Sequence, residues 1–132
     1  MGDWFSTTGI AEKRSFNLPD NSVVHLNANS SVRYDEEEWA ENRVIELEGE
    51  GFFEVATGSD FIVNTPKGAI KVVGTAFNVF SRDDILKVAC FEGTVQVTNV
   101  INKTKILQVG NEVTIDSNSD RLKIDVFDLN QT

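Results

Sequence analysis

Four glutamates at short spacing are the first residues of this 132-residue chain that could do chemistry: Glu46, Glu48, Glu50 and Glu54. Side chains along a β-strand repeat with period two, so the first three would share one face of a strand. Two carboxylates that face each other across a sugar cleft are the machinery of glycoside hydrolysis. Apolar residues alternate with these glutamates, however, and this pattern favours an exposed acidic face of a half-buried strand.

The only histidine and the only cysteine of the chain lack the partners that catalysis requires. His25 lies between Val24 and Leu26, so we expect its ring to point outward, and no second metal ligand pairs with it. Cys90 lies in the apolar run 88–91, which predicts a buried packing residue rather than a nucleophile. A lone cysteine also excludes an internal disulfide.

Two acidic clusters are candidates for metal binding. Residues 116–120 match the opening of a calcium loop, but Arg121 stands where that loop needs glycine and Phe127 where it needs glutamate. Residues 35–38 are adjacent like charges, which repel one another and face solvent. We predict a hairpin turn at 116–120, a solvated turn or helix start at 35–38, and no catalytic, cofactor-binding or metal-binding residue. No phosphate loop, zinc spacing or nucleophile elbow is present.

Composition excludes further classes. Twelve Lys and Arg stand against 21 Asp and Glu, a net charge of −9, which argues against binding to nucleic acid or to anionic lipid. The length allows one domain. There is no apolar run of membrane-spanning length and no signal peptide. The chain opens directly into Asp3, and we interpret it as a fragment of a longer protein.

The elements that must position these residues are almost all strands. About ten short strands at the spacing of a sandwich, barrel or coil of sheet fall within residues 23–34, 44–55, 61–80, 85–100 and 105–126. Pro66, Lys67 and Gly68 indicate a short hairpin, and residues 35–43 are the only segment with helical propensity, at most two turns. The prediction is an all-β single domain of two stacked sheets, either a β-sandwich of jelly-roll type or a solenoid-like coil.

A short phrase recurs three times, each time as a glycine followed by alternating apolar residues. Gly51, Gly74 and Gly93 begin the three copies, and Phe and Val side chains in each copy would point to one side. Glycine permits a positive φ or a close backbone approach where the chain turns back into a sheet. The spacing suggests similar β units stacked on one another, although such a pattern also recurs by chance in β-rich chains.

Six segments carry a family resemblance, in this order: 18–34 (LPDNSVVHLNANSSVRY), 44–55 (VIELEGEGFFEV), 61–68 (FIVNTPKG), 73–79 (VGTAFNV), 92–97 (EGTVQV) and 107–112 (LQVGNE). Together they resemble the FecR family of anti-sigma regulators over about residues 16–127, and the phrasing around residues 27–39 is most similar to the Bacteroidetes branch. Asn21 stands where the family has a turn glycine and Gly51 where it has alanine. Asparagine also tolerates the left-handed conformation.

The resemblance implies a role and a location. Such regulators sit in the inner membrane of Gram-negative bacteria, where a cytoplasmic segment holds an extracytoplasmic-function sigma factor. A transmembrane helix leads to a periplasmic portion, which receives a signal from a ligand-occupied TonB-dependent outer-membrane receptor. We therefore expect a lead-in at 1–15, the periplasmic domain at 16–127 and a tail at 128–132. This fragment would be no enzyme and would make no membrane contact.

The partners implied are the receptor's signalling domain and, through a cytoplasmic segment that this chain does not include, the sigma factor. A rigid sheet with exposed edges can accept a strand from a partner without any catalytic group. Two alternatives remain open: a carbohydrate-binding or hydrolytic β module, with Trp39 and Tyr34 as its aromatic platform, and a structural spacer without a partner.

Overall fold

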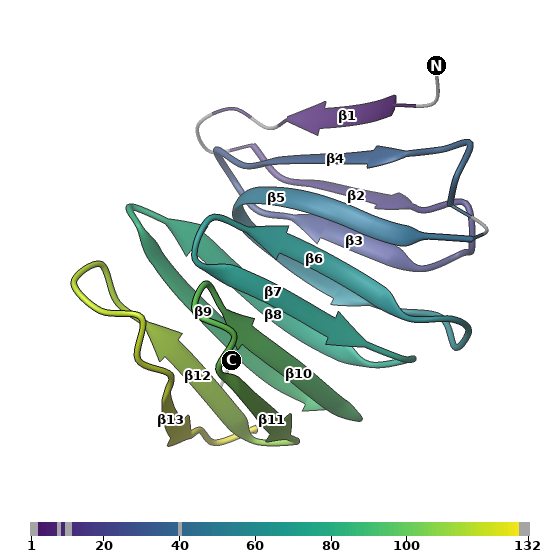
Figure 1. Cartoon of the computed structure of the whole chain (residues 1–132). Helices are drawn as coiled ribbons and strands as arrows, with labels where there is room; N and C mark the ends of the chain where they lie inside the picture. The colour runs from purple at the N-terminus through teal and green to yellow at the C-terminus, as the bar shows by residue number, and fades with distance from the viewer. Residues whose placement is uncertain (1–2, 8, 10–11, 40, 130–132) are drawn as a thin grey trace.

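The computed structural model describes residues 3–7, 9, 12–39 and 41–129. That part of the chain forms thirteen strands and no helix (Figure 1). The strands are β1 (Asp3–Thr7), β2 (Arg14–Asn17), β3 (Val23–Leu26), β4 (Ser31–Asp35), β5 (Arg43–Glu54), β6 (Phe61–Thr65), β7 (Gly68–Val72), β8 (Ala76–Arg82), β9 (Ile85–Glu92), β10 (Thr94–Asn99), β11 (Thr104–Gln108), β12 (Asn111–Ile115) and β13 (Lys123–Val126).

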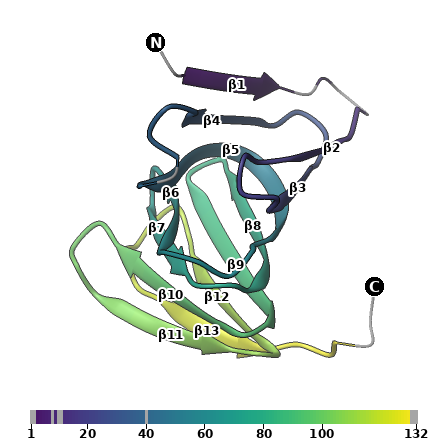
Figure 2. The ribbon, with the colours of Figure 1, turned by 90° about the vertical axis from the view of Figure 1, so that its right-hand side faces the viewer.

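The strands form two stacked sheets that share the twelve-residue strand β5. The first half of β5 pairs with β4 and β6, and the second half pairs with β3 and β8. The first sheet runs β1-β4-β5-β6-β7-β10-β11, and the second runs β2-β3-β5-β8-β9-β12-β13. In Figure 2, β6 and β7 lie on one side of the molecule and β8 and β9 on the other. The predicted all-β architecture of two stacked sheets is confirmed.

Successive hairpins alternate between the two sheets. The hairpin β6–β7 belongs to the first sheet, β8–β9 to the second, β10–β11 to the first and β12–β13 to the second. The β6–β7 turn is formed by Pro66 and Lys67, because Thr65 pairs with Gly68, as the sequence predicts. Two successive hairpins therefore add two strands to each sheet. The chain coils back and forth between the sheets while it builds the sandwich.

Glycines with positive φ mark points where the chain passes from one sheet to the other. Gly74 (φ 69°) lies between β7 and β8, Gly93 (φ 76°) between β9 and β10, and Gly110 (φ 92°) between β11 and β12. Left-handed backbone conformations cost little for glycine and much more for other residues. The repeated glycine therefore reflects repeated sheet crossings.

In the first copy of the repeat the crossing glycine is Gly49, not Gly51. Gly49 has φ 102° and stands in the middle of β5, where the strand leaves one sheet for the other. A Cβ atom there would overlap the side chain of Ser30. The Ser30 hydroxyl accepts a hydrogen bond from the amide of Glu50 at 2.9 Å and donates to the carbonyl of Ala28 at 3.1 Å. This contact fixes the bend of β5 against the turn before β4.

The core lies between the sheets and is built on three fully buried phenylalanines. Phe53 stacks on Phe77, with ring centroids 5.2 Å apart, and meets Phe61 at 6.2 Å. The Val79, Val95 and Val97 side chains of the repeats are equally buried. The predicted gathering of Phe and Val along one side of the strands is confirmed.

Among the described residues between β4 and β5, 36–39 and 41 form a turn rather than a helix. The Asp35 carboxylate accepts hydrogen bonds from the amides of Glu37 (3.0 Å) and Glu38 (3.4 Å), and the amide of Asn42 donates to the carbonyl of Glu38. The long strand β5 already begins at Arg43. A helix needs several turns to offset the cost of its nucleus, and the connection is too short to supply them.

Part of the expected lead-in takes part in the first sheet. β1 pairs along its length with β4 in antiparallel fashion, and β2 already begins at Arg14. Among the described residues, no helix has the length and apolar character required to cross a bilayer.

Candidate functional site

The four glutamates of β5 do not share one cleft: Glu46 and Glu48 line an open hollow of about 520 Å³ that excludes the other two. The bend at Gly49 places Glu46 and Glu48 on the outer face of the first sheet and leaves Glu50 and Glu54 on the outer face of the second. The Glu50 carboxylate accepts one hydrogen bond from the amide group of Asn27 and one from that of Asn78, at 2.8 and 2.9 Å. Glu46, Glu48 and Glu54 are exposed and Glu50 is half-buried on outer sheet faces, which agrees with the acidic-face interpretation.

His25 points outward, as expected, but it has partners that the sequence did not reveal. Its Nε2 lies 2.6 Å from Glu54 Oε2 and its Nδ1 lies 2.8 Å from Ser15 Oγ. When the neutral ring donates Nε2–H to Glu54, Nδ1 accepts the hydroxyl proton of Ser15. Three strands bring the three groups together on an exposed sheet face, with 43% of the His25 side chain and 53% of the Glu54 side chain accessible.

Both acidic clusters are turns. Residues 116–120 connect β12 to β13, which pair as an antiparallel hairpin, and Asp116 accepts a hydrogen bond from the amide of Asn118 at 3.0 Å. This confirms the predicted hairpin turn. In the described ranges, no three His, Cys, Asp or Glu side chains are grouped so that they could hold a metal ion.

Cys90 is fully buried, as predicted. Burial raises the pKa of its thiol, and a hydrogen bond with the backbone of Glu92 opposes this only in part. The thiolate is the reactive form of cysteine, so the position disfavours nucleophilic chemistry.

The proposed aromatic platform of a carbohydrate module is part of the core. Tyr34 and Trp39 are 5% and 2% exposed, and their ring centroids lie 4.9 Å apart. Burial, with the nearby carboxylates of Glu36 and Asp20, raises the pKa of Tyr34 to about 12. Neither ring is available to stack on a sugar.

An ion pair between the buried Arg43 and the partly buried Asp20 explains the aspartate of the Leu18–Ser22 turn. Arg43 Nη1 lies 2.6 Å from Asp20 Oδ2, and the same guanidinium donates to the carbonyls of Ala56 and Ser59. Burial acts to raise the pKa of Asp20, but hydrogen bonds from Arg43 and Ser22 outweigh it and hold the pKa below its ordinary value. Asn21 has φ 71° in this turn, the conformation for which glycine is usual.

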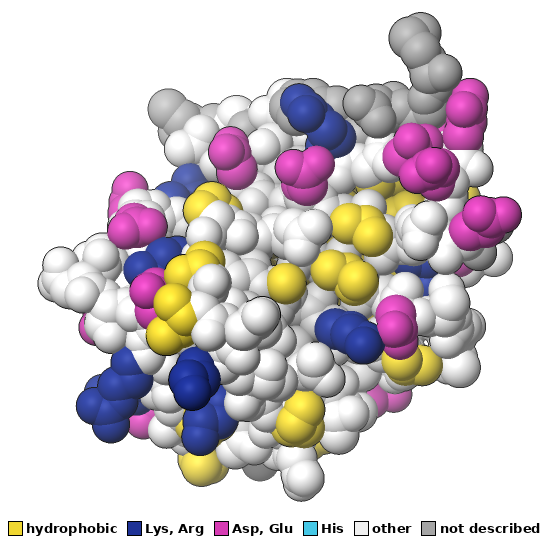
Figure 3. Space-filling model, in the orientation of Figure 1, with side chains coloured by type: hydrophobic (Ala, Val, Ile, Leu, Met, Phe, Trp, Pro, Cys, Tyr) yellow, Lys and Arg dark blue, Asp and Glu magenta, His cyan; other side chains and the backbone are white. Residues whose placement is uncertain are grey.

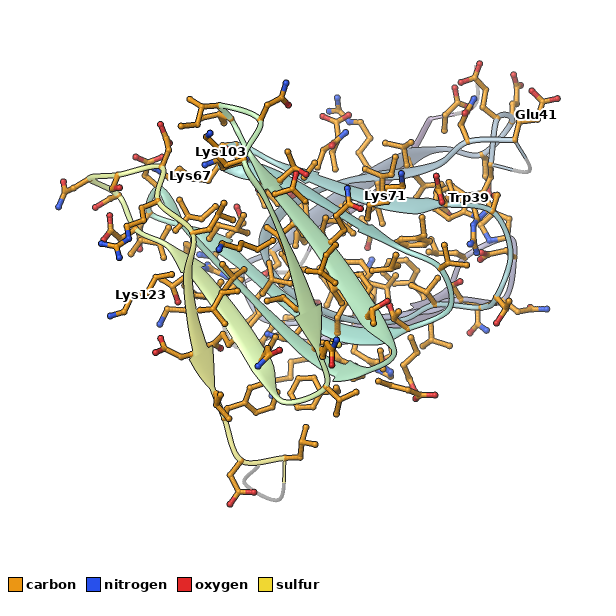
Figure 4. The ribbon with its side chains drawn as sticks, turned by 60° about the horizontal axis from the view of Figure 1, so that its bottom comes forward. Trp39, Glu41, Lys67, Lys71, Lys103 and Lys123 are labelled. Carbon is orange, nitrogen blue, oxygen red and sulfur yellow. The ribbon has the colours of Figure 1, made fainter. Side chains whose placement is uncertain are left out.

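Charge is unevenly spread over the chain. Residues 1–66 hold 13 of the 21 acidic residues and four of the 12 basic ones. On the face shown in Figure 3, Asp and Glu gather toward the upper right, near the turn after β4, and Lys and Arg toward the lower left. Figure 4 shows Trp39 and Glu41 at one end and Lys67, Lys103 and Lys123 at the other.

The end of the molecule opposite Trp39 has unpaired sheet edges. Among the described strands, β11 pairs with β10 alone and β13 with β12 alone, and both lie at the bottom of Figures 1 and 2. Seven of the nine large apolar side chains that are exposed in the described part belong to residues 100–129: Val100, Ile101, Ile106, Val109, Ile124, Val126 and Leu129. We call β11, β13 and these side chains the apolar edge. Exposed apolar groups gathered beside open strands are typical of an interaction surface.

Comparison with known proteins identifies the family. Residues 6–96 match the family described as FecR protein, and no curated protein matches the chain. Two crystal structures of a candidate anti-sigma factor from Parabacteroides distasonis ATCC 8503 superpose with TM-scores of 0.89 and 0.88, at 30% and 29% identity. Each match covers 96% of this chain and 61% of the other, so the chain spans about three-fifths of these solved relatives. The family match over more than half of its length shows that this chain belongs to the FecR family.

Proposed function

We propose that this chain is the periplasmic signal-receiving domain of an anti-sigma regulator of the inner membrane. In this role it relays the occupancy of a TonB-dependent outer-membrane receptor to an extracytoplasmic-function sigma factor. Membership of the FecR family and the likeness to a candidate anti-sigma factor support the regulatory role. The sigma factor would be held by a cytoplasmic segment of the longer protein.

The observation that carries the proposal is the apolar edge. Its strands offer backbone donors and acceptors along a free side, and its exposed Ile and Val side chains offer apolar contact. A strand from the receptor's signalling domain that pairs with β13 would gain backbone hydrogen bonds and cover Val126, which is 82% exposed. The signal is then transmitted by binding alone, and no reacting group is needed.

Calorimetry with the receptor's signalling domain tests the proposal, the receptor being chosen from the gene adjacent to that of the regulator. We expect saturable binding that Val126→Lys weakens, because the substitution places a charge where an apolar contact forms. Val73→Lys is the matched control, since Val73 is 51% exposed and lies outside the apolar edge. Absence of binding at high concentration, or an equal loss of affinity in the Val126→Lys and Val73→Lys variants, would contradict the proposal.

Tyr34 and Trp39 are the residues that suggested a carbohydrate-binding role. Both are buried, so they do not support that role. A spacer role predicts no binding by the apolar edge, and the same calorimetry separates it from the proposed function.

A further inference from the structure

The outer face of the second sheet carries a continuous row of ring side chains. His25 and Phe52 have ring centroids 6.0 Å apart, Phe52 and Phe91 are 5.6 Å apart, and Phe91 and Phe127 are 5.0 Å apart. The four rings come from β3, β5, β9 and the segment that follows β13. We call them the aromatic ridge. It crosses the width of the sheet on the side opposite the core.

Regular alternation in β9 places Phe91 on this face, and a β-bulge keeps Glu92 on the same face beside it. Phe77 pairs with Cys90 and Ala76 pairs with Glu92, so Phe91 is the additional residue that has no partner in register. Cys90 points into the core, while Phe91 is 37% exposed. Bulges commonly redirect a side chain at functional positions. In a strand without a bulge, alternation would send Phe91 and Glu92 to opposite faces.

The strand registers place carboxylates in the two outward-facing rows at the ridge, and the nearest lysines, Lys87 and Lys123, stand in the next row of the same face. Two neighbouring rows of cross-strand partners contain or flank the rings. The first row consists of Val23, Glu54, Ala76 and Glu92. The second row consists of Ser15, His25, Phe52, Asn78, Ala89, Glu112 and Asp125. Glu112 and Asp125 stand directly opposite each other, which is unfavourable for like charges. A cation placed over this pair would relieve the repulsion.

One carboxylate of this face is preorganised by the ridge itself. His25 holds Glu54 through Oε2, on a side chain that is 53% exposed. A shallow hollow of about 310 Å³ lies next to His25 and Phe52, and Lys13 and Arg14 form part of its lining. The cationic segment is therefore placed over the rings and carboxylates rather than in this hollow.

We propose that the aromatic ridge binds an extended, lysine- or arginine-bearing segment of a partner protein. Cationic head groups pair with the carboxylates of Glu54, Glu92, Glu112 and Asp125, and the aliphatic stems pack on the phenylalanine rings. Cations are attracted to the faces of aromatic rings, and negative charge on both sides disfavours acidic partners. The inference deepens the proposed function and rests on it, because it names the chemistry of a partner segment and a second surface, which meets the apolar edge only at β13.

The test uses the isotopically labelled domain and two capped pentapeptides of alternating sequence, Arg-Val-Arg-Val-Arg and Glu-Val-Glu-Val-Glu. We expect the cationic peptide to give saturable amide shifts in β3, β5 and β9 that weaken as salt is added. We expect the acidic peptide to give none. Shifts centred on β11, or equal shifts with both peptides, would overturn the proposal.

Matched variants separate local recognition from net charge. Glu54→Gln with Glu92→Gln should weaken binding of the cationic peptide roughly fivefold or more, because two exposed ion pairs are lost. Glu36→Gln with Glu37→Gln removes the same charge from the turn after β4 and should leave binding unchanged. Phe91→Ser should weaken binding while the spectrum stays that of the folded domain. Equal loss in the two double variants would show a bulk charge effect and refute the proposal.

The receptor's signalling domain distinguishes this inference from the function on which it rests. If Val126→Lys abolishes receptor binding and the ridge variants do not, the ridge proposal fails and the proposed function stands. If the receptor domain does not bind while the cationic peptide binds the ridge, the receptor relay fails and the ridge remains a site for another basic partner.

Discussion

Replacing Arg43 by methionine should be among the most damaging single changes in this domain. The guanidinium is 4% exposed, lies 2.6 Å from Asp20 and donates to the carbonyls of Ala56 and Ser59. Methionine retains part of the apolar contact with the ring of Phe61, over which the guanidinium lies at 5.5 Å. It leaves a largely buried carboxylate without its counterion and two carbonyls without a donor.

Breaking a buried ion pair from one side costs about 3–5 kcal/mol. The whole domain is expected to unfold with about 5–15 kcal/mol, so the loss is a large fraction of the total. For a chain of this length it corresponds to a fall in Tm of roughly 11–18 °C. Urea unfolding followed by far-ultraviolet circular dichroism measures the change, and Arg121→Met, on an exposed loop, is the control.

The pH dependence of stability supplies a second test of the same pair. The pKa of Asp20 is lower in the folded state than in the unfolded chain, so its ionised form stabilises the fold. That contribution is present above the unfolded pKa of about 3.9 and is lost as pH falls through the folded pKa. Asp20→Asn should therefore reduce the acid sensitivity of the domain.

The reasoning fails if Arg43→Met costs less than about 1 kcal/mol, the level of an exposed pair. It also fails if Asp20→Asn retains the full loss of stability on acidification. A double-mutant cycle with both substitutions should show a coupling well above the few tenths of a kcal/mol found for independent sites.

Four further outcomes follow from single positions. Gly49→Ala should destabilise the fold by about 1–3 kcal/mol, measured by urea unfolding, because a positive φ is strained for alanine and Ser30 occupies the space; Gly58→Ala, with only ordinary contacts, is the control. Phe53→Ala should cost about 3–5 kcal/mol, and Phe52→Ala, on the outer face, clearly less; similar losses would contradict the assignment of the core. Cys90 should react with a thiol reagent at pH 8 only after unfolding, because it is buried and its pKa is raised; rapid reaction of the folded domain would exclude this. Tyr34, the only tyrosine, should ionise near pH 12 in absorbance titration; since its folded pKa is raised, its contribution to stability is complete below about pH 10 and is lost as pH rises through the folded value.

Local patterns were sufficient to predict the strands from β3 to β13, whereas β1 and β2 fell in or across the end of the expected lead-in. Alternation of apolar and polar residues identified the strands, and the Pro66–Lys67 turn and the loop at 116–120 were predicted from turn-forming residues. The burial of Cys90 and the outward direction of His25 followed from the same alternation. These are properties of neighbouring residues, so the sequence contains them directly.

The helical propensity of 35–43 and the placement of the crossing glycine show the limit of local reasoning. Helical propensity there is outweighed because β5 begins at Arg43 and packs on both sheets. Gly51 shares the repeated phrase, but Gly49 bends the strand, and only its contact with Ser30 from a distant turn shows this.

By itself, the sequence determined the all-β class, the hairpins, the phenylalanine core and the family, because each depends on side-chain alternation, turn chemistry or an ordered set of motifs. Only the tertiary structure decided which surfaces can bind a partner. The Asp20–Arg43 pair, the contact of His25 with Ser15 and Glu54, the aromatic ridge and the apolar edge all join residues that are far apart in the chain. Their proximity follows from strand register, bulges and sheet crossings, which are set by the packing of the whole domain.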